Sequence, residues 1–353
     1  MTGQGYQLFV DELTRLAGRT GDQRVQPIAA RVAKPLRVAV GGRPGAGCRT
    51  VAHALAGAGL SVARSALAAG ADVQVYVLAE APKPEDREAV AAVHDARQPL
   101  VVVLNKADLS GFHGAGPMAA AQARCARLSA VLGLPVVPMI GLLAAAALHG
   151  LDEAYWPALR ALAANDGGLA CLDGSFDGFL SAELAVPAPM RMRLLEALDL
   201  FGIAVAVAAV RRGAPPARVR DLLRRASGVD AVADRVVAAG GRTRYRRILE
   251  AVTTLEAMAV TDPRIARCLS GDDMVLARMS AALDAVSGPH VQPADPQDQV
   301  SAQLRRAVRW QRHRRSRGGR AGGVDAACAA DIIRGSLRLW SRAGGVAESG
   351  EHR

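Results

Sequence analysis

Residues 34–59 of the chain read KPLRVAVGGRPGAGCRTVAHALAGAG. Residues 36–42 are an apolar, β-branched run that ends in glycines, and residues 50–59 repeat apolar side chains at helical spacing. A strand, a glycine-rich loop and a helix in this order are the setting of a phosphate-binding loop. The stretch therefore predicts an α/β fold with an anion site at the end of a strand.

The glycine loop fits the phosphate-loop pattern G-x-x-x-x-G-K-[ST] only in part. Gly42 and Gly47 match its glycines, but Cys48 and Arg49 replace the Lys that neutralises phosphates and the Ser or Thr that binds Mg²⁺. Thr50 lies one position late and would bind the metal only if the loop were shifted by one residue. The backbone N–H groups of the loop still suit an anion, and Cys48 reads either as a small buried residue or as a thiol of lowered pKa.

Strands and helices alternate from the glycine loop to about residue 165. After residue 59, the segments expected to be strands are 71–80, 99–108 and 135–140, and those expected to be helices are 83–96, 117–132 and 151–164. This alternation predicts a doubly wound parallel sheet. Ligands of such sheets bind at the carboxyl ends of the strands, where both the glycine loop and a second motif, NKAD, are found.

The pattern changes at residues 166–190, which are rich in Gly, Asp and Pro and which we interpret as a linker. The helices expected outside the sheet cover 6–18, 191–211, 216–239, 242–260, 272–286, 300–312 and 325–341. The expected organisation is an N-terminal helix and lead-in at 1–33, a sheet domain at 34–165, the linker at 166–190, a helical bundle at 191–300 and a basic segment with a terminal helix at 301–353.

Composition bounds the cellular setting of the chain. Half of the 353 residues are hydrophobic but only 3% are aromatic, so the core must consist mainly of Ala, Leu and Val. The five cysteines are scattered without a CxxC pair, which argues against a zinc site or a disulfide framework. No signal peptide is expected at the N-terminus, and the apolar run 200–210 is too short to span a membrane. We therefore expect a cytoplasmic protein and interpret 200–210 as part of a buried helix.

The NKAD motif, Asn105 to Asp108, follows the apolar run LVVVL. In GTPases an NKxD motif recognises guanine, because the Asp carboxylate accepts two hydrogen bonds from the base that adenine cannot offer. Lys106 is one of only three lysines in the chain, and its aliphatic stem would cover the plane of the base. The alternative is that Asn105 and Asp108 only turn the chain after a strand.

With both motifs, the chain resembles the TRAFAC-class P-loop GTPases and, more narrowly, the dynamin-like GTPases of actinobacteria of the isoniazid-inducible kind. The resemblance covers about residues 30–260 and rests on KPLRVAVGGRPGAG, LVVVLNKAD, LLEALDLFGIAVAVAAVRRG and LLRRASGVDAVADRV. It implies a reduced P-loop GTPase-like sheet followed by an all-α bundle, and a site for GTP or GDP. The nucleotide-binding residues that it implies are Gly42, Arg43, Gly45, Gly47, Arg49, Thr50, Asn105, Lys106 and Asp108.

The chain departs from this family where hydrolysis would occur. Residues 60–70 contain no DxxG motif and leave no room for a pair of further strands, so the switch regions that hold Mg²⁺ and the attacking water are missing. The late base-side motif, usually SAK, is replaced by MIGLLA at 139–144. We assign no catalytic residue and no metal ligand, and binding of Mg²⁺ stays an open question.

The positive charge is concentrated near the C-terminus. The net charge is +11, and residues 301–353 contain twelve Arg against four acidic residues. The run 305–320 predicts contact with an anionic membrane surface at the inner face of the membrane or with an acidic protein, and Trp310 would insert into lipid or stack on a base. No RNA- or DNA-binding motif accompanies it, so nucleic acid is the less favoured partner. The alternative is an exposed helix face followed by a flexible segment.

Three hypotheses follow from the sequence. The first is a pseudo-GTPase that binds guanine nucleotide without hydrolysing it and that regulates or supports a partner, including a competent GTPase. The second is an active, non-standard GTPase that uses Thr50 for Mg²⁺ and an arginine such as Arg49, or groups supplied by a partner. The third is a structural adaptor that binds no nucleotide.

Overall fold

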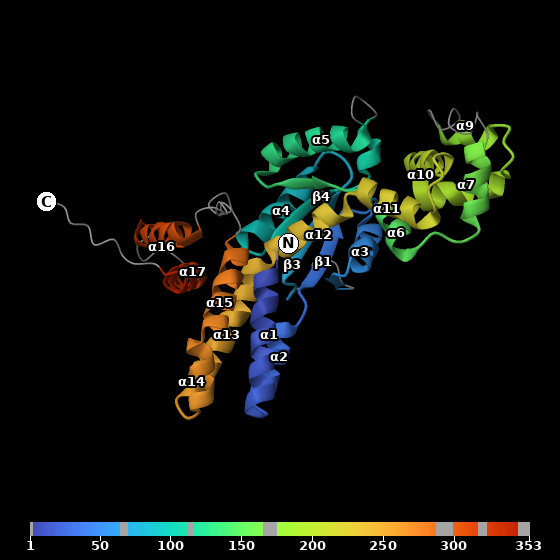
Figure 1. Cartoon of the computed structure of the whole chain (residues 1–353). Helices are drawn as coiled ribbons and strands as arrows, with labels where there is room; N and C mark the ends of the chain where they lie inside the picture. The colour runs from blue at the N-terminus through green and yellow to red at the C-terminus, as the bar shows by residue number, and fades with distance from the viewer. Residues whose placement is uncertain are drawn as a thin grey trace. The chain divides into compact units, whose positions relative to one another are not determined.

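The computed structural model describes residues 3–63, 70–111, 116–164, 175–286, 299–316 and 323–344. The chain divides into two compact units. Leu36–Val236 forms the sheet unit, and Met1–Pro35 together with Val237–Arg353 forms the helical unit (Figure 1). This division differs from the expected one, because the N-terminal helix joins the C-terminal helices, whereas residues 166–236 belong with the sheet.

The sheet unit is built on a five-stranded, all-parallel sheet with the order β2-β1-β3-β4-β5. The strands are β1 (Arg37–Gly42), β2 (Ser61–Val62), β3 (Val73–Leu78), β4 (Leu100–Leu104) and β5 (Val136–Pro138). The predicted α/β class and parallel sheet are confirmed. The short β2, which pairs with β1, was not predicted, because two residues are too few to give a period.

Three helices connect these strands: α3 (Cys48–Gly57), α4 (Pro84–Asp95) and α5 (Pro117–Leu132). From β1 the chain adds β2 on one side, and from β3 it adds β4 and β5 on the other. Because parallel crossovers are right-handed, this change of direction places α3 on the face opposite α4 and α5 (Figure 1). Helices on both faces explain why the expected strands were continuously apolar.

A second group of helices completes the sheet unit: α6 (Gly141–His149), α7 (Tyr155–Ala164), α9 (Phe176–Ser181), α10 (Ala188–Arg211) and α11 (Pro216–Ser227). They share an apolar core that includes Leu143, Leu159 and Phe179. Helix α6 was not predicted, although it begins immediately after β5 and lies against α3, α10 and α11.

Two expected helices are interrupted. The helix expected at 191–211 is part of α10, but Asp199 within it has φ 58° and ψ 175°, which breaks the helical geometry. The single helix expected at 216–239 is wrong: α11 ends at Ser227, and α12 (Val229–Ala239) follows after Gly228, with the boundary between the units falling inside α12. Gly228 has φ 73°, and a Cβ there would lie 2.9 Å from the carbonyl oxygen of Pro138, so only glycine fits this turn.

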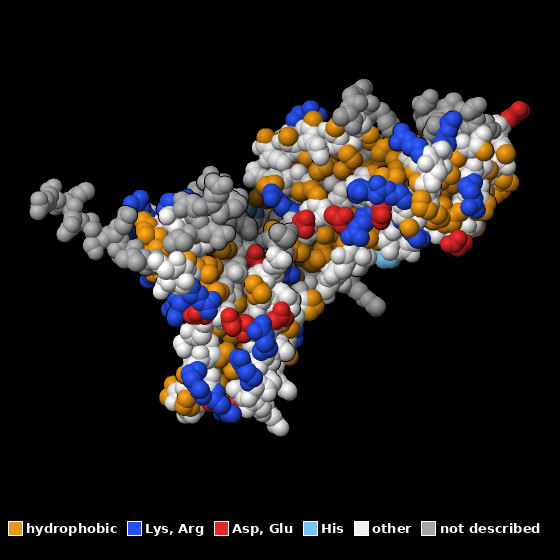
Figure 2. Space-filling view, in the orientation of Figure 1, with side chains coloured by type: hydrophobic (Ala, Val, Ile, Leu, Met, Phe, Trp, Pro, Cys, Tyr) orange, Lys and Arg blue, Asp and Glu red, His pale blue; other side chains and the backbone are white. Residues whose placement is uncertain are grey.

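The helical unit contains α1 (Gln4–Thr20), α2 (Val25–Ala33), α13 (Gly241–Ala259), α14 (Pro263–Ser270), α15 (Asp272–Ala285), α16 (Gln299–Ser316) and α17 (Gly323–Arg342). Helix α1 packs along α15 and α2, and α17 packs on α15 and α16. Phe9, Leu13 and Leu16 form the buried stripe of α1 at helical spacing. Basic and acidic side chains are interspersed over the visible surface of this unit (Figure 2).

A buried carboxylate anchors α17 inside the helical unit. Asp331 accepts a hydrogen bond from the hydroxyl of Tyr245 at 2.7 Å, and Arg278 donates to it through Nε at 3.0 Å and pairs with it through Nη2 at 2.8 Å. Asp331 and Tyr245 are buried. The donors come from α13 and α15, so this network ties three helices that are distant in sequence.

The apolar run at 200–210 belongs to the core rather than to a membrane span. Ile203, Ala206 and Val207 are fully buried within the sheet unit. In the part of the chain that the structure describes, no helix is both long and apolar enough to cross a membrane.

Candidate functional site

The glycine loop joins β1 to α3, as predicted. Gly42 ends β1, and Gly45 and Gly47 both have φ 85°, a left-handed conformation that favours glycine. A Cβ on Gly47 would also collide with the amide nitrogen of Asn105. Gly47 caps α3 without any side-chain hydrogen bond. The first N–H groups of α3 therefore have no intrahelical partner and are available to an anion.

Asn105 connects the two predicted motifs. Its amide nitrogen donates to the carbonyl of Ala46 in the glycine loop at 2.9 Å, and its amide oxygen accepts from the N–H of Gly141 at 2.9 Å. The side chain is buried, and these two bonds use its donor and acceptor groups in opposite directions. Asn105 thus holds the glycine loop and the start of α6 together at the carboxyl ends of the strands.

Lys106 and Asp108 follow in a tight turn. Lys106 has φ 55° and is exposed, and Asp108 lies in a 3₁₀ turn, Ala107–Ser110, with only 6% of its surface exposed. The turn is fixed by a hydrogen bond from the N–H of Ala107 to the carbonyl of Met139 at 3.2 Å. No side-chain donor binds the Asp108 carboxylate among the residues that the structure describes. Its acceptor capacity is therefore only partly used by backbone N–H groups.

Asp199 is a neighbour of this carboxylate that the sequence did not reveal. Burial raises the pKa of Asp108 most, and the negative charge of Asp199 raises it further, while backbone N–H groups and Lys106 oppose the rise. Asp199 occupies the non-helical position inside α10 and accepts a hydrogen bond from the N–H of Leu200 at 2.6 Å. A like charge beside a buried carboxylate is unfavourable for folding and is found more often at functional sites.

Arg43 is held by two carboxylates, Glu80 in the loop after β3 and Asp86 in the first turn of α4. Its Nε lies 2.8 Å from Asp86 and its Nη2 lies 3.1 Å from Glu80. Asp86 is buried and also accepts from the Tyr76 hydroxyl and from the N–H of Lys83, each at 2.8 Å. In this state Arg43 braces the glycine loop against the start of α4 rather than extending toward an anion.

The three residues after the glycines occupy different surroundings. Cys48 is half-buried, and burial raises the pKa of its thiol, which argues against an activated thiol. Arg49 is exposed, and no hydrogen bond or ion pair holds it in the described parts of the chain. The methyl group of Thr50 lies 3.5 Å from where a Cβ on Gly141 would be, so Thr50 faces the side of Asn105 and α6. This placement gives no support to Thr50 as a metal ligand.

Sequence reasoning missed the partners that hold these residues. Asp86 could have been suspected, because KPED carries an acid three residues into a helix that begins with proline, a capping position. Gly141, Glu80 and Asp199 carry no comparable local signal, since their roles depend on contacts with residues more than thirty positions away. Within the described ranges, no cluster of His, Cys, Asp and Glu side chains could hold a metal ion.

The described part of the basic run, residues 305–316, lies in α16, and its aromatic residue is not where we predicted it. Trp310 is buried in the apolar core of the helical unit and stacks edge-on with His313. The prediction that Trp310 inserts into lipid or stacks on a base is therefore wrong, because the residue faces α17 and the core. Arg312, Arg314 and Arg315 are exposed, whereas 317–320 fall outside the described residues.

Comparison with known proteins gives no family for this chain. No family model, curated protein or solved structure matches it significantly.

Proposed function

We propose that the sheet unit binds GDP or GTP at the carboxyl ends of β1 and β4 and does not hydrolyse GTP efficiently. The observation that carries this proposal is the position of Asn105, whose amide joins the glycine loop to the N-terminus of α6. A turn-forming Asn would need only local partners. An Asn that spans two loops at one end of a sheet serves a shared site, as the nucleotide hypothesis requires.

On the base side of this site the NKAD motif is intact, although the late base-side motif is replaced. Asp108 has a buried carboxylate with acceptor positions to spare, which suits the paired N–H groups of guanine. Lys106 is exposed beside it and can lay its stem over the base. Adenine offers no such donor pair, so the arrangement favours guanine.

The residues on the phosphate side of the site suit nucleotide binding better than they suit hydrolysis. The N-terminus of α3 offers N–H groups to an anion, and Arg49 is free to add charge. Cys48 and Arg49 supply neither a lysine nor a metal-binding hydroxyl, and Thr50 faces α6. Without groups that hold Mg²⁺ and the attacking water, we expect nucleotide binding that does not require Mg²⁺ and a role as a regulatory or scaffolding pseudo-GTPase.

The test is equilibrium binding of fluorescent GDP and GTP to the full chain, with and without Mg²⁺ and with ATP as competitor. Asp108→Asn removes the acceptor pair, and Asp95→Asn is the matched control, because Asp95 is an exposed carboxylate on α4. We expect binding that GDP but not ATP displaces, that Asp108→Asn loses and that Asp95→Asn keeps.

The two alternatives, an active GTPase and a structural adaptor, each predict a different result in that experiment. Binding that strengthens with Mg²⁺ and is followed by phosphate release would establish an active, non-standard GTPase. Absence of binding at high protein concentration would leave the structural adaptor and sink the nucleotide proposal.

A second proposal concerns the partners of α16. The exposed Arg312, Arg314 and Arg315 form no ion pair within the described part of the chain, so they offer positive charge to an anionic membrane surface or an acidic protein. Co-sedimentation with anionic and neutral vesicles, against pull-down with an acidic peptide, distinguishes the two. An R312Q/R314Q/R315Q variant that binds like the wild type in both assays would remove this proposal.

A further inference from the structure

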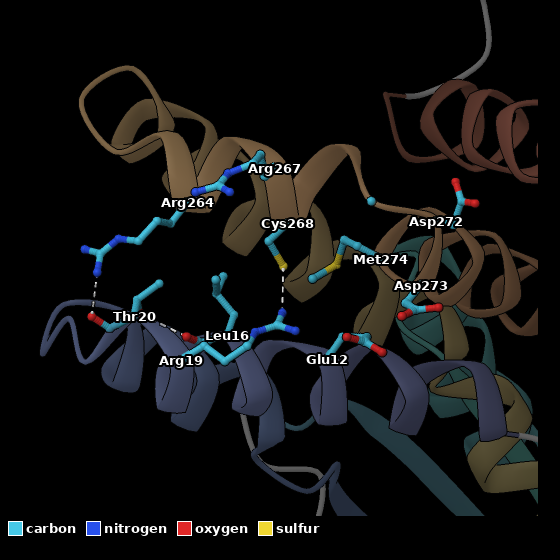
Figure 3. Close-up of a pocket in the computed structure, with 11 residues that line it drawn as sticks. Glu12, Leu16, Arg19, Thr20, Arg264, Arg267, Cys268, Asp272, Asp273 and Met274 are labelled. Atoms are coloured by element: carbon cyan, nitrogen blue, oxygen red, sulfur yellow. Dashed lines mark hydrogen bonds between the residues drawn. The ribbon is translucent and has the colours of Figure 1, made fainter.

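We propose that a pocket in the helical unit binds a small ligand with an oxyanion group, a carboxylate or a phosphate monoester, on an apolar body. The pocket lies between the C-terminal half of α1, α14 and the start of α15, and its volume is about 380 Å³ (Figure 3). That volume falls in the range of sites for small molecules. This proposal is independent of the nucleotide site, which belongs to the other unit.

Three arginines supply the cationic side of the pocket: Arg19 from α1, and Arg264 and Arg267 from α14. Arg264 is already committed, because it pairs with Asp262 at 2.9 Å and donates to the carbonyl of Thr20 at 3.2 Å. These bonds tie the end of α1 to α14 and fix the width of the pocket. Arg264 is therefore a structural brace, and Arg19 and Arg267 are the groups available to a ligand.

Arg19 and Arg267 are not neutralised by the acids of the same pocket. Arg19 reaches only the sulfur of Cys268 at 3.8 Å, and Arg267 makes only a long hydrogen bond of 3.4 Å to the carbonyl of Pro263. Neither guanidinium forms an ion pair among the described residues. Two guanidinium groups with unused donors on one cavity match a carboxylate or phosphate oxygen pair.

Two of the three acids that line the pocket, Glu12 and Asp272, pair with arginines that do not line it. Glu12 pairs with Arg15 at 2.6 Å, and Asp272 pairs with Arg338 at 3.2 Å and with Arg342. Their charge is thus compensated from α1 and α17 rather than across the pocket. Asp273, which is exposed, is the acid left without such a partner in the described chain. A ligand with one anionic group fits this balance better than a polyanion, which Asp273 would repel.

The floor of the pocket is apolar and contains a cysteine whose reactivity can report ligand binding. Leu16 of α1 and Met274 of α15 face each other, and the thiol of Cys268 points to the same space (Figure 3). Cys268 is half-buried, and burial raises the pKa of its thiol. A ligand whose apolar body covers Leu16 and Met274 would also cover this sulfur.

The test measures protection of Cys268 from N-ethylmaleimide in the full chain, followed by peptide mass spectrometry. The probes are phenyl phosphate, 4-methylpentanoate and, as a neutral analogue, benzyl alcohol. We expect one or both oxyanions to protect Cys268, and the pair identifies which oxyanion the pocket prefers. Arg19→Gln and Arg267→Gln should each weaken protection by about ten- to a hundred-fold, the loss typical of a charge-assisted hydrogen bond.

Arg31→Gln is the matched control, because Arg31 is exposed on α2 and does not line the pocket. Circular dichroism of each variant verifies that α1 and α14 remain folded. The proposal is overturned if neither oxyanion protects Cys268 at millimolar concentration. Equal protection by benzyl alcohol, or unchanged protection in both arginine variants, would also overturn it.

Discussion

Two buried aspartates, one in each unit, differ in the hydrogen bonds that their carboxylates accept from side chains. Asp331 of the helical unit is 3% exposed and is bonded by Tyr245 and by two nitrogens of Arg278. Asp108 of the sheet unit is 6% exposed, has no side-chain donor among the described residues, and lies near the like charge of Asp199. A carboxylate that only holds helices together is saturated with donors, whereas one that keeps acceptor positions unused is suited to a ligand.

Removal of the saturated carboxylate should have the largest effect. Asp331→Leu leaves the buried guanidinium of Arg278 without its partner, so we expect the free energy of unfolding to fall by about 3–5 kcal/mol. Urea denaturation followed by circular dichroism measures this loss. Tyr245→Phe should cost less, because it removes one hydrogen bond and leaves the ion pair intact.

The matched control replaces both charges. Asp331→Leu combined with Arg278→Met leaves no unpaired charge, and much of the lost stability should return. If the double variant is no more stable than Asp331→Leu alone, the unpaired guanidinium is not the cause and the comparison of the two aspartates fails.

The next largest effect is expected at Asn105. Asn105→Ala leaves the carbonyl of Ala46 and the N–H of Gly141 without their partner, which should destabilise the sheet unit by about 2–4 kcal/mol. Asn105→Asp is the informative comparison, because it keeps the acceptor for Gly141 but replaces the donor to Ala46 with a buried carboxylate oxygen that repels that carbonyl, so we expect it to be destabilising as well. A loss below about 1 kcal/mol for Asn105→Ala would mean that the glycine loop is held by other contacts.

The parts of this site that the sequence predicted are those fixed by local pattern. Strands β1 and β4 are mostly apolar because they are covered on both faces, and the loop glycines at 45 and 47 adopt conformations that favour glycine. These features depend on a residue and its immediate neighbours. They can therefore be predicted without knowledge of the fold.

The parts that the sequence did not predict depend on distant contacts. Asn105 meets Ala46 across 59 positions, and Arg43 meets Asp86 across 43. Gly228 divides an expected helix because the carbonyl of Pro138 leaves no room for a side chain. Trp310 lies on the apolar side of a basic helix. Only the packing of that side of the helix against the core determines that Trp310 is buried.

Substitution of Asp108 should change stability and GDP affinity in opposite directions. Asp108→Asn removes the charge that burial and Asp199 disfavour, so the sheet unit should become slightly more stable. The same change should lower GDP affinity by about a hundred-fold if two charge-assisted hydrogen bonds are lost. Denaturation and fluorescent-nucleotide titration measure the two effects.

Asp331→Asn is the counterpart in the helical unit. It should lower stability, because Arg278 and Tyr245 lose the charged acceptor, and leave nucleotide affinity unchanged. A loss of stability in Asp108→Asn would contradict the distinction drawn between the two aspartates.

The smallest expected effect is the pH dependence of the stability of the sheet unit. Carboxyl groups with pKa shifts of opposite sign contribute to it. Burial and then Asp199 raise the Asp108 pKa, so the ionised form is disfavoured in the folded state, and this cost disappears as the pH falls through the raised pKa. For Asp86, burial acts upward, but the N–H of Lys83, the Tyr76 hydroxyl and Arg43 together hold the pKa below its ordinary value of 3.8. Hydrogen bonding from Arg43 and the charge of Lys83 likewise lower the Glu80 pKa.

The stability that Asp86 and Glu80 contribute is present above their ordinary pKa values and is lost as the pH falls toward their lowered ones. Acidification from pH 7 should therefore shrink both the advantage of Asp108→Asn and the disadvantage of Glu80→Gln relative to the wild type. Denaturation midpoints of the three proteins at pH 7, 5 and 4 measure both differences. If Glu80→Gln is as stable as the wild type at pH 7, Arg43 does not brace the glycine loop through Glu80 as its contacts indicate.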